Sequence, residues 1–378
     1  MPRKAPDPNE ALSLVGKVGP KCRPVWEGRS PEEQVALARY FLPHSSSKEV
    51  LSPTHPRVIK WYCPFASQAD FPTGHRYCIN VFTGCDHKCV YCYAAGYEPQ
   101  QASGKRNFRK LLDKDMEELE SFDVPPAPVH LSNSTDPFQP LEAETGDARY
   151  ALEQILAHRN RFTTVMVLTK NPLRPVRLGY VEILRDLVPL PADDPRFGEF
   201  NERDLPGFCM EISLAFWRDE ARAAYDPKAP TVEERKEGIR ALHQAGIPLV
   251  LRIDPLFPLS PFTRQPQEVL DDFALPEAQT IDDLEKLVLF AREIGARHVV
   301  YSSAKITLPR QHKLSETMQA IRMVYQHLTA PEKLVFRGGS WRLPQHVAET
   351  EVLGEFLAIC KREDMPAKHC KQNLLETP

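Results

Sequence analysis

The stretch Thr83-Gly84-Cys85-Asp86-His87-Lys88-Cys89-Val90-Tyr91-Cys92-Tyr93 holds three of the nine cysteines of the chain, spaced four and three residues apart. It follows a run typical of a buried strand, so the thiols leave the end of that strand on a tight loop. Thiolates with this spacing can bind three corners of one iron–sulfur cube. No fourth cysteine lies nearby, so one iron would keep an open position for a substrate.

Two other interpretations of these cysteines remain open at this point. A zinc ion could bind the three thiolates together with His87, although four ligands within eight residues make a crowded tetrahedral site. The cysteines could instead be buried structural residues, but the flanking Gly84, Asp86 and Lys88 argue against a plain apolar core. The pattern favours the cluster over both alternatives.

Length and composition restrict the class of protein. The chain has 378 residues, enough for one α/β barrel or for a core with appendages. Its 48 basic and 51 acidic residues exclude a uniformly polycationic surface, but not a local basic strip. No window approaches about 18 consecutive apolar residues, and the N-terminus lacks a secretory signal pattern. We therefore expect a cytoplasmic protein with no membrane partner, in which clustered cysteines bind metal rather than form disulfides.

From residue 77 onward, short apolar runs alternate with helical patterns, which predicts a parallel sheet with right-handed crossovers. Six such units fit a partial (β/α)6 barrel better than a doubly wound sheet. The expected strands are Tyr77–Thr83, Val129–Ser132, Thr164–Leu168, Cys209–Leu214, Leu249–Ile253 and His298–Tyr301. The expected helices are Arg149–His158, Val176–Leu187, Thr231–Ala245 and Thr280–Ile294.

The remaining segments divide the chain into three parts. Residues 1–76 read as an N-terminal arm, residues 77–310 as the core and residues 311–378 as a small C-terminal helical appendage. The arm carries one helix signal, which begins at Ser30-Pro31-Glu32-Glu33, and the appendage carries a helical pattern at Ala348–Lys361. Residues 189–207 and 255–278 are expected to be long loops, the second with Leu256, Phe257 and Phe262 exposed.

Strand alternation also predicts which side chains share a face. If Ser213 points into the barrel, Cys209 and Glu211 do so too, and Arg252 lies on the same face as Asp254. An ionisable interior suits a polar substrate and is costly otherwise. The opposite arrangement, with Met210 and Ile212 inside, remains an alternative.

The cysteine motif, Cys-x3-Cys-x2-Cys after the first strand, followed by Tyr93, resembles the signature of the radical S-adenosylmethionine (radical SAM) superfamily. Later segments are similar to its spore photoproduct lyase-like (DNA repair photolyase-like) branch. These segments are Ser134-Thr135-Asp136-Pro137-Phe138-Gln139-Pro140-Leu141-Glu142, Leu168-Thr169-Lys170-Asn171, Ile212-Ser213-Leu214, and Arg235, Ala241, Gly246 and Asp254-Pro255. The resemblance covers about residues 77–310 and implies a TIM-type radical SAM barrel.

The resemblance also implies cofactors and site residues. Cys85, Cys89 and Cys92 would hold a 4Fe–4S cluster, which receives its electron from an external flavodoxin- or ferredoxin-like donor. The SAM contacts would be Tyr93 beside the adenine; Ser134, Thr135 and Asp136 near the amino group; Lys170 at the carboxylate; and Ser213 at the ribose or sulfonium end. A zwitterionic cofactor needs such a set of donors and acceptors.

The sequence departs from spore photoproduct lyase in one respect. No cysteine lies between Cys92 and Cys209, so the thiol that serves that enzyme as hydrogen-atom donor after the second strand is missing. The substrate, the hydrogen donor and the catalytic residues therefore stay unassigned. An auxiliary cluster on Cys360 and Cys370 is disfavoured, because nine residues separate them.

Three functions remain open from the sequence. The first is a radical SAM enzyme acting on a nucleic-acid base; residues 51–110 hold eight basic and three acidic residues, concentrated at Lys105–Lys110. The second is a radical SAM enzyme acting on a small molecule or peptide. The third is a non-catalytic iron–sulfur or zinc protein that senses redox state.

Overall fold

A computed structural model describes residue 30 and residues 58–60, 77–99, 101–121, 126–189, 207–258, 268, 270–309, 313–337 and 339–370. The expected helix after Ser30, Phe262 and most of the 189–207 connection lie outside these residues. None of the described helices is long and apolar enough to cross a membrane.

The centre of the molecule is an eight-stranded sheet in the order β1-β2-β5-β6-β7-β8-β9-β13. All neighbours from β2 to β13 are parallel, and β1 pairs antiparallel with β2. The strands are β1 (Ile59–Lys60), β2 (Tyr77–Ile79), β5 (Ala127–Leu131), β6 (Phe162–Thr169), β7 (Phe208–Ser213), β8 (Leu249–Leu256), β9 (Val299–Ser303) and β13 (Ala367–His369). The predicted parallel partial barrel is confirmed, and the sheet is open in the described residues because β1 and β13 do not pair with each other.

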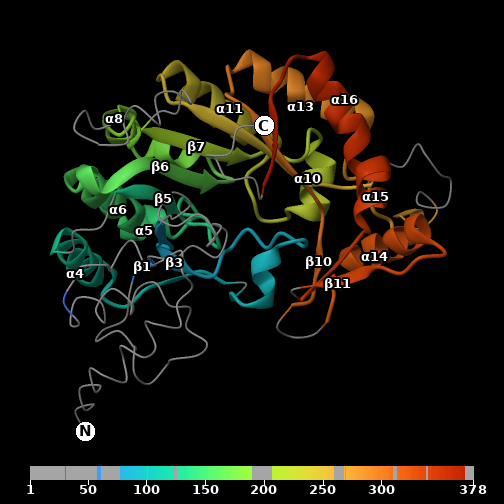
Figure 1. The fold of residues 1–378 in the computed structure, drawn as a ribbon, viewed down its shortest axis with the longest axis horizontal. Helices are drawn as coiled ribbons and strands as arrows, with labels where there is room; N and C mark the ends of the chain where they lie inside the picture. The colour runs from blue at the N-terminus through green and yellow to red at the C-terminus, as the bar shows by residue number, and fades with distance from the viewer. Residues whose placement is uncertain are drawn as a thin grey trace, which may run out of the picture.

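Helices connect consecutive strands and cover the outer side of the curved sheet (Figure 1). They are α4 (Phe108–Ser121), α5 (Glu142–Thr145), α6 (Asp147–Ala157), α7 (Leu173–Arg177), α8 (Val181–Asp186), α10 (Asp219–Tyr225), α11 (Val232–Gln244) and α13 (Ile281–Glu293). α11 and α13 begin with capping boxes at Thr231 and Thr280, where the sequence predicted their starts. One expected helix, Val176–Leu187, is instead two, because Gly179 adopts φ +73° between α7 and α8.

After β9, the chain forms a second layer beside the barrel. β10 (Ile306–Thr307), β12 (Ser340–Arg342) and β11 (Val335–Arg337) make a small antiparallel sheet, and α14 (Glu316–Thr329) lies between β10 and β11 along the chain. α15 (Gln345–Ala348), a π-helical turn (Glu349–Leu353) and α16 (Gly354–Arg362) then lead to β13. The segment expected as a helical appendage thus contains strands as well, and the three-part division of the chain stays a prediction.

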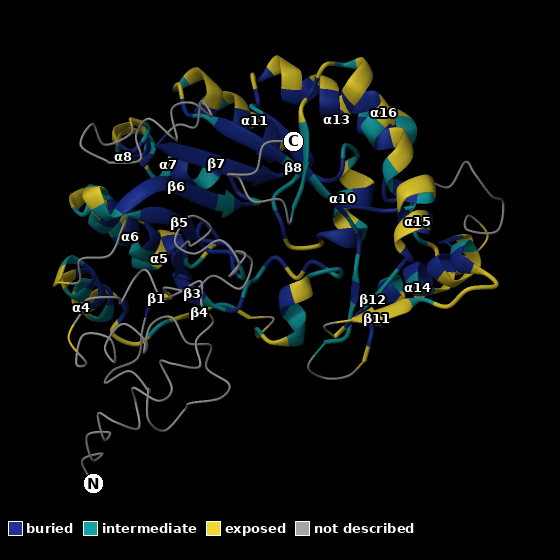
Figure 2. Ribbon diagram, viewed as in Figure 1, coloured by how far each residue is buried: buried dark blue, intermediate teal, exposed yellow. Residues whose placement is uncertain are grey.

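The two faces of the sheet differ in chemistry. Strand residues that face the helices, such as Val165, Ile212 and Leu251, belong to one large apolar core, and the central strands β5, β6 and β7 are buried along almost their whole length (Figure 2). On the opposite face, Cys209 packs with Val250 and Val300 in a separate small cluster. The ionisable side chains on these strands share that inner face, so the prediction of a polar barrel interior is confirmed.

The expectation that Leu256 and Phe257 are exposed is wrong. Leu256 closes β8 and is buried, and the Phe257 ring packs against the rings of Tyr91 and Tyr225. The Phe257 backbone N–H donates to the side-chain oxygen of Gln279 at 2.9 Å, which ties the chain after β8 to the start of α13. This segment therefore extends the core instead of forming an exposed flap.

Candidate functional site

The loop with the three cysteines is held by close backbone packing. It begins after β3 (Phe82–Thr83), which pairs with β4 (Ser103–Gly104). Gly84 has φ +75°, and a Cβ atom there would lie 2.1 Å from the carbonyl oxygen of Gln101. Only glycine fits this approach. The Asp86 backbone N–H also donates to the side-chain oxygen of Gln139 at 3.0 Å, which anchors the loop to the chain after β5.

The thiols lie in surroundings that keep them protonated in the absence of metal. Burial, together with the Asp136 carboxylate, raises the pKa of Cys85 to about 12. Burial also raises the pKa values of Cys89 and Cys92. A bound iron cluster reverses this preference, because a cationic metal stabilises the thiolate and expels its proton.

The residues present fit an iron–sulfur cube better than a single metal ion. In the described ranges, no three His, Cys, Asp or Glu side chains converge on a point that could hold one ion. A cube does not require such convergence, since each of its thiolates binds a different iron. His87, the fourth ligand of the zinc alternative, instead directs Nε2 to Asp136 Oδ2 at 2.9 Å.

Asp136 joins three loops at the carboxyl-terminal ends of the strands. Its Oδ2 accepts from His87 Nε2 and from the backbone N–H of Lys170 at 2.7 Å. Its Oδ1 accepts from Thr169 Oγ1 at 2.8 Å and from the backbone N–H of Phe138 at 2.9 Å. Burial would raise the pKa of this carboxyl, but His87 and these hydrogen bonds lower it overall. Asp136 is therefore an ionised junction, and its predicted place near the SAM amino group stays a prediction.

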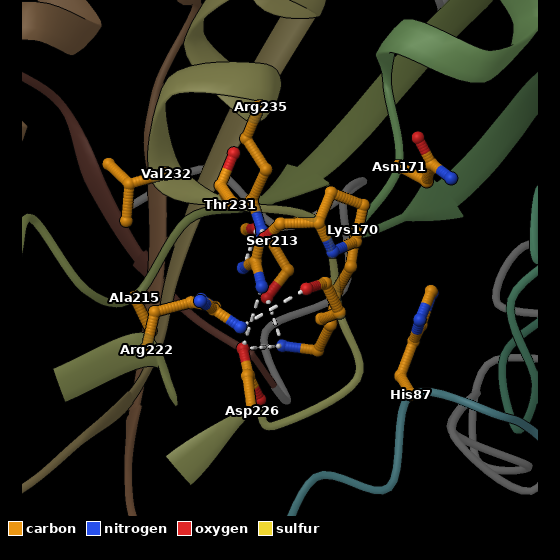
Figure 3. Close-up of polar contacts among 12 residues, drawn as sticks. His87, Lys170, Asn171, Ser213, Ala215, Arg222, Asp226, Thr231, Val232 and Arg235 are labelled. Carbon is orange, nitrogen blue, oxygen red and sulfur yellow. Dashed lines mark hydrogen bonds and ion pairs between the residues drawn. The ribbon is translucent and has the colours of Figure 1, made fainter. Parts of the chain in front are cut away.

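The structure brings Lys170 and Ser213 together, as the sequence predicted for two SAM contacts. Lys170 Nζ lies 3.0 Å from Ser213 Oγ, 2.8 Å from Tyr91 Oη and 3.2 Å from Asp226 Oδ2 (Figure 3). These three acceptors use all the N–H donors of the ammonium group. A SAM carboxylate that binds Lys170 must therefore displace one of these acceptors or share its N–H donor.

Asp226 is the charged centre of this network. It follows α10 and is fully buried, with Arg235 Nη2 at 3.1 Å and Tyr91 Oη at 2.5 Å. Burial would raise the pKa of Asp226, yet Lys170 and Arg235 outweigh it and hold that pKa well below its usual range. Asp226 thus pairs with one fully buried cation, Arg235, and with the largely buried Lys170.

The remaining predicted SAM contacts lie on one side of the cysteine loop. Tyr93 opens a short 3-10 turn (Tyr93–Gly96), and its hydroxyl donates to the carbonyl oxygen of Asn133. Ser134 Oγ lies 3.1 Å from the hydroxyl oxygen of Tyr97, the residue that directly follows this turn. Thr135 Oγ1 is buried and has no hydrogen-bond partner among the described residues. An unsatisfied buried hydroxyl beside the cysteine loop is consistent with a ligand-binding role.

The inner face of β7, β8 and β9 carries a second set of charges. Arg252 Nη1 lies 2.7 Å from Glu211 Oε2, and its Nη2 lies 2.7 Å from Asp254 Oδ2. Ser302 Oγ donates to Asp254 Oδ1 at 2.5 Å. Cys370, just after β13, donates its backbone N–H to Tyr301 and packs against the small inner cluster of Cys209. These groups make the interior polar at the point where a barrel enzyme holds its substrate.

Sequence reasoning missed Tyr91, Asp226 and the structural role of Arg235. Tyr91 lies inside the cysteine motif, so its position was a usable signal. Asp226 follows a helix outside every recognisable motif, and only the fold brings it to Lys170, from which 56 residues separate it. Lys105 and Arg109, expected on a basic surface strip, are engaged instead: Lys105 Nζ donates to the carbonyl of Asn80, and Arg109 pairs with Asp147 at 2.9 Å.

Solved structures with a similar arrangement of strands and helices include spore photoproduct lyase. One mutant of that enzyme superposes with a TM-score of 0.50 at 12% identity, over 81% of this chain and 78% of the other. A mutant with bound AdoMet and dinucleoside spore photoproduct gives the same TM-score at 13% identity and the same coverage. The chain has the fold of spore photoproduct lyase. The resemblance to the spore photoproduct lyase-like branch of the radical SAM superfamily is thereby confirmed at the level of fold.

Sequence comparisons reach less far. No protein-family profile matches the chain. "Uncharacterized protein MJ0683" of Methanocaldococcus jannaschii is 24% identical over 187 residues, which is 49% of this chain and 62% of that protein. The matched residues cover less than two thirds of that relative. The activity of this chain is therefore a proposal and not a conclusion from sequence similarity.

Proposed function

We propose that this protein is a radical SAM enzyme that abstracts hydrogen from its substrate, a nucleic-acid base. When bound, a reduced 4Fe–4S cluster supplies the electron that cleaves SAM to methionine and a 5′-deoxyadenosyl radical. The observation that carries the proposal is the position of Cys85, Cys89 and Cys92. They lie on one loop beside the Lys170–Ser213 pair, at the edge of a parallel sheet where barrel enzymes hold their substrates.

The chain supplies binding and orientation for this chemistry. The three cysteines would hold three irons, and the fourth iron would stay open for SAM. Lys170 would donate to the SAM carboxylate in place of one of its present acceptors, while Ser213 Oγ, 3.0 Å away, would mark the ribose or sulfonium end. Tyr93, Ser134, Thr135 and Asp136 would bind the adenine and the amino group. An external flavodoxin- or ferredoxin-like protein would donate the electron.

An exposed aromatic surface near the cysteine loop supports a nucleic-acid substrate. Phe336 on β11 is 57% exposed, and its ring centroid lies 5.0 Å from that of Trp341 on β12. The guanidinium of Arg322 lies 4.3 Å from the Trp341 ring centroid, and Arg337 is exposed on the same strand as Phe336. An exposed Phe336 ring, backed by the half-buried Trp341 and flanked by arginines, suits stacking on a base and contact with phosphates.

This small sheet lies beside the cysteine loop. β10, which pairs with β12, is in contact with the 3-10 turn that begins at Tyr93. A strand of nucleic acid on the Phe336–Trp341 surface would therefore pass close to the barrel interior. The spore photoproduct lyase structure with a bound dinucleoside photoproduct is compatible with such a substrate. The missing thiol between Cys92 and Cys209 argues for a hydrogen donor other than the one used in that enzyme.

Anaerobic reconstitution tests the enzyme proposal. The full-length protein, loaded with iron and sulfide and reduced with dithionite, is expected to convert SAM to 5′-deoxyadenosine, measured by liquid chromatography. Cys89→Ala is expected to abolish cluster absorbance and product, whereas Cys360→Ala, on the distant α16, keeps both. A loaded wild-type protein that binds SAM without forming 5′-deoxyadenosine would instead indicate the non-catalytic iron–sulfur role.

Binding measurements test the nucleic-acid substrate. Single-stranded DNA is expected to bind the loaded enzyme with an affinity that falls as salt rises, because phosphate contacts release counterions. Phe336→Ala, together with Arg337→Ala, is expected to weaken this binding by about tenfold. DNA binding that is absent at low salt would favour a small molecule or peptide as substrate.

A further inference from the structure

A pocket of about 420 Å³ lies beside the cysteine loop, from which His87 contributes to its lining. Its polar lining comes from five segments. These are the cysteine loop with His87, the chain after β6 with Asn171, α7 with Arg174 and Arg177, the chain after α10 with Lys228, and α11 with Glu234. None of the three cysteines, Lys170 or Ser213 lines it. Figure 3 shows His87 and Asn171 to one side of the Asp226 network. The pocket therefore adjoins the proposed SAM site, since His87 also contacts Asp136, but the cysteines, Lys170 and Ser213 do not line it.

The lining of this pocket is positively charged. Arg174, Arg177 and Lys228 bring three cations, and among the described residues neither Arg174 nor Lys228 forms an ion pair. Arg177 has only a distant partner, Glu237, at 4.0 Å, and both side chains are largely exposed. The one acidic lining residue, Glu234, is engaged elsewhere, since its carboxylate accepts from the backbone N–H and hydroxyl of Thr231.

Two buried polar atoms on the lining residues have no partner in the described part of the chain. They are His87 Nδ1 and Arg174 Nε. The His87 side chain is only 3% exposed, and its Nε2 donates to Asp136, so Nδ1 is left for another group. Buried polar atoms without partners are rare in folded proteins, and each calls for a missing partner. Arg174 Nε is a donor that suits an anionic oxygen, whereas His87 Nδ1, opposite a donating Nε2, is an acceptor that suits a hydroxyl or amino group of the same occupant.

We propose that this pocket binds the phosphate group of a phosphorylated small molecule, up to the size of a nucleotide. The volume is in the range of sites for such ligands. Three cationic side chains carry more positive charge than a single bound carboxylate would balance. They suit a phosphomonoester, which carries about −1.5 to −2 charges at neutral pH. The Arg174 and Arg177 guanidiniums supply paired N–H donors for phosphate oxygens, and Lys228 supplies a point charge.

The occupant would touch the cysteine loop directly. His87 lies between Cys85 and Cys89, and the carbonyl oxygen of His87 accepts from the backbone N–H of Lys228 at 3.1 Å. An occupant whose phosphate binds Lys228 and whose hydroxyl or amino group donates to His87 would therefore restrain the loop. Binding itself needs neither the cluster nor SAM, so it can be measured independently of the proposed function.

Isothermal titration of the full-length metal-free protein tests the site. AMP is expected to bind at least about tenfold more tightly than adenosine, which lacks the phosphate. Inorganic phosphate is expected to compete with AMP. A 5′-phosphorylated oligonucleotide, compared with its unphosphorylated form, distinguishes a nucleic-acid end from a free nucleotide as the source of the phosphate. Equal affinity for AMP and adenosine, or no competition by phosphate, would overturn the proposal.

Variants separate the pocket from general charge effects. Arg174→Gln with Lys228→Gln is expected to weaken AMP binding by about tenfold or more, while Lys286→Gln on α13 leaves it unchanged. Lys228 is exposed, so the single variant Lys228→Gln keeps the fold and still loses part of the affinity. Wild-type affinity in both Lys228 variants would refute the assignment. Because metal-free protein is used, a failure of SAM cleavage would leave this result untouched.

Discussion

Lys170 Nζ and Asp226 Oδ2 lie 3.2 Å apart, although 56 residues separate them in the sequence. Lys170 follows β6, in a segment that resembles one of the spore photoproduct lyase-like branch. Asp226 follows α10, in a connection that carries no recognisable motif. Asp226 is fully inaccessible in this ion pair, whereas the Lys170 side chain is 16% exposed. Its geometry therefore sets both the charge at the cysteine loop and the direction in which Lys170 points.

Removing this carboxylate should destabilise the protein. Asp226→Ala leaves the fully buried Arg235 and the largely buried Lys170 without a counter-charge, which costs about 3–5 kcal/mol. Urea unfolding followed by circular dichroism measures the change. The matched variant Asp282→Ala removes a carboxylate from an exposed pair with Lys286 and should change stability by less than about 1 kcal/mol. Equal effects of the two variants would contradict the role given to Asp226.

Lys170→Met should reduce SAM affinity while leaving cluster loading intact. Loss of one charge-assisted hydrogen bond to the SAM carboxylate corresponds to roughly 10- to 100-fold weaker binding. Equilibrium dialysis of the reconstituted protein with labelled SAM gives the dissociation constant. Lys286→Met serves as the control, since Lys286 lies on α13 in an exposed pair. Unchanged affinity in Lys170→Met would show that another group receives the carboxylate.

Gly84→Ala should prevent cluster assembly. The added methyl group would lie 2.1 Å from the Gln101 carbonyl oxygen at a φ of +75°, so the loop that carries Cys85 must move. Iron content and cluster absorbance after reconstitution report the loss. Gly104→Ala on β4 is the control, because a Cβ atom there meets nothing within 4 Å. Normal iron loading of Gly84→Ala would mean that the loop tolerates displacement.

Acidification should destabilise the fold through His298. Burial, then the cations Lys368 and Arg297, lower the pKa of His298 to about 4, and Glu211 opposes this only partly. The unfolded state binds a proton near pH 6.5, so stability is complete above that pH and falls as pH drops toward 4. The full loss is about 3 kcal/mol.

Urea unfolding between pH 4.5 and 7 measures this dependence. His298→Gln should remove part of the slope, because the side chain no longer titrates. His346→Gln, at a position where the side chain is 66% exposed, should leave the slope unchanged. A slope that is the same in wild type and His298→Gln would exclude this histidine as its source.

The parallel core was predictable because each strand is a run of apolar residues that ends at clear punctuation. The starts of α11 and α13 were predicted at Thr231 and Thr280 from the helical patterns that follow, and the inner face followed from strand alternation once Ser213 was placed inside. β13 was not predictable, since Ala367-Lys368-His369 has no apolar pattern and becomes a strand only by pairing with β9.

The candidate site was predictable where it is local in sequence. The cysteine loop and the position of Lys170 rest on motifs, whereas the Asp226 network and the basic pocket lined by Arg174 and Lys228 arise from contacts between distant segments. Phe257 was misjudged because its neighbours are charged and proline-rich, yet Gln279 ties its backbone into the core. Local composition could not reveal that contact.

The pairing of β13 with β9 has a consequence for biosynthesis. β9 (Val299–Ser303) leaves the ribosome well before residues 367–369, so its outer edge stays without a hydrogen-bonding neighbour while α14 to α16 are being made. An open sheet edge is a template for unwanted pairing with other chains. The nascent protein is therefore prone to aggregation until β13 has been synthesised and pairs with β9.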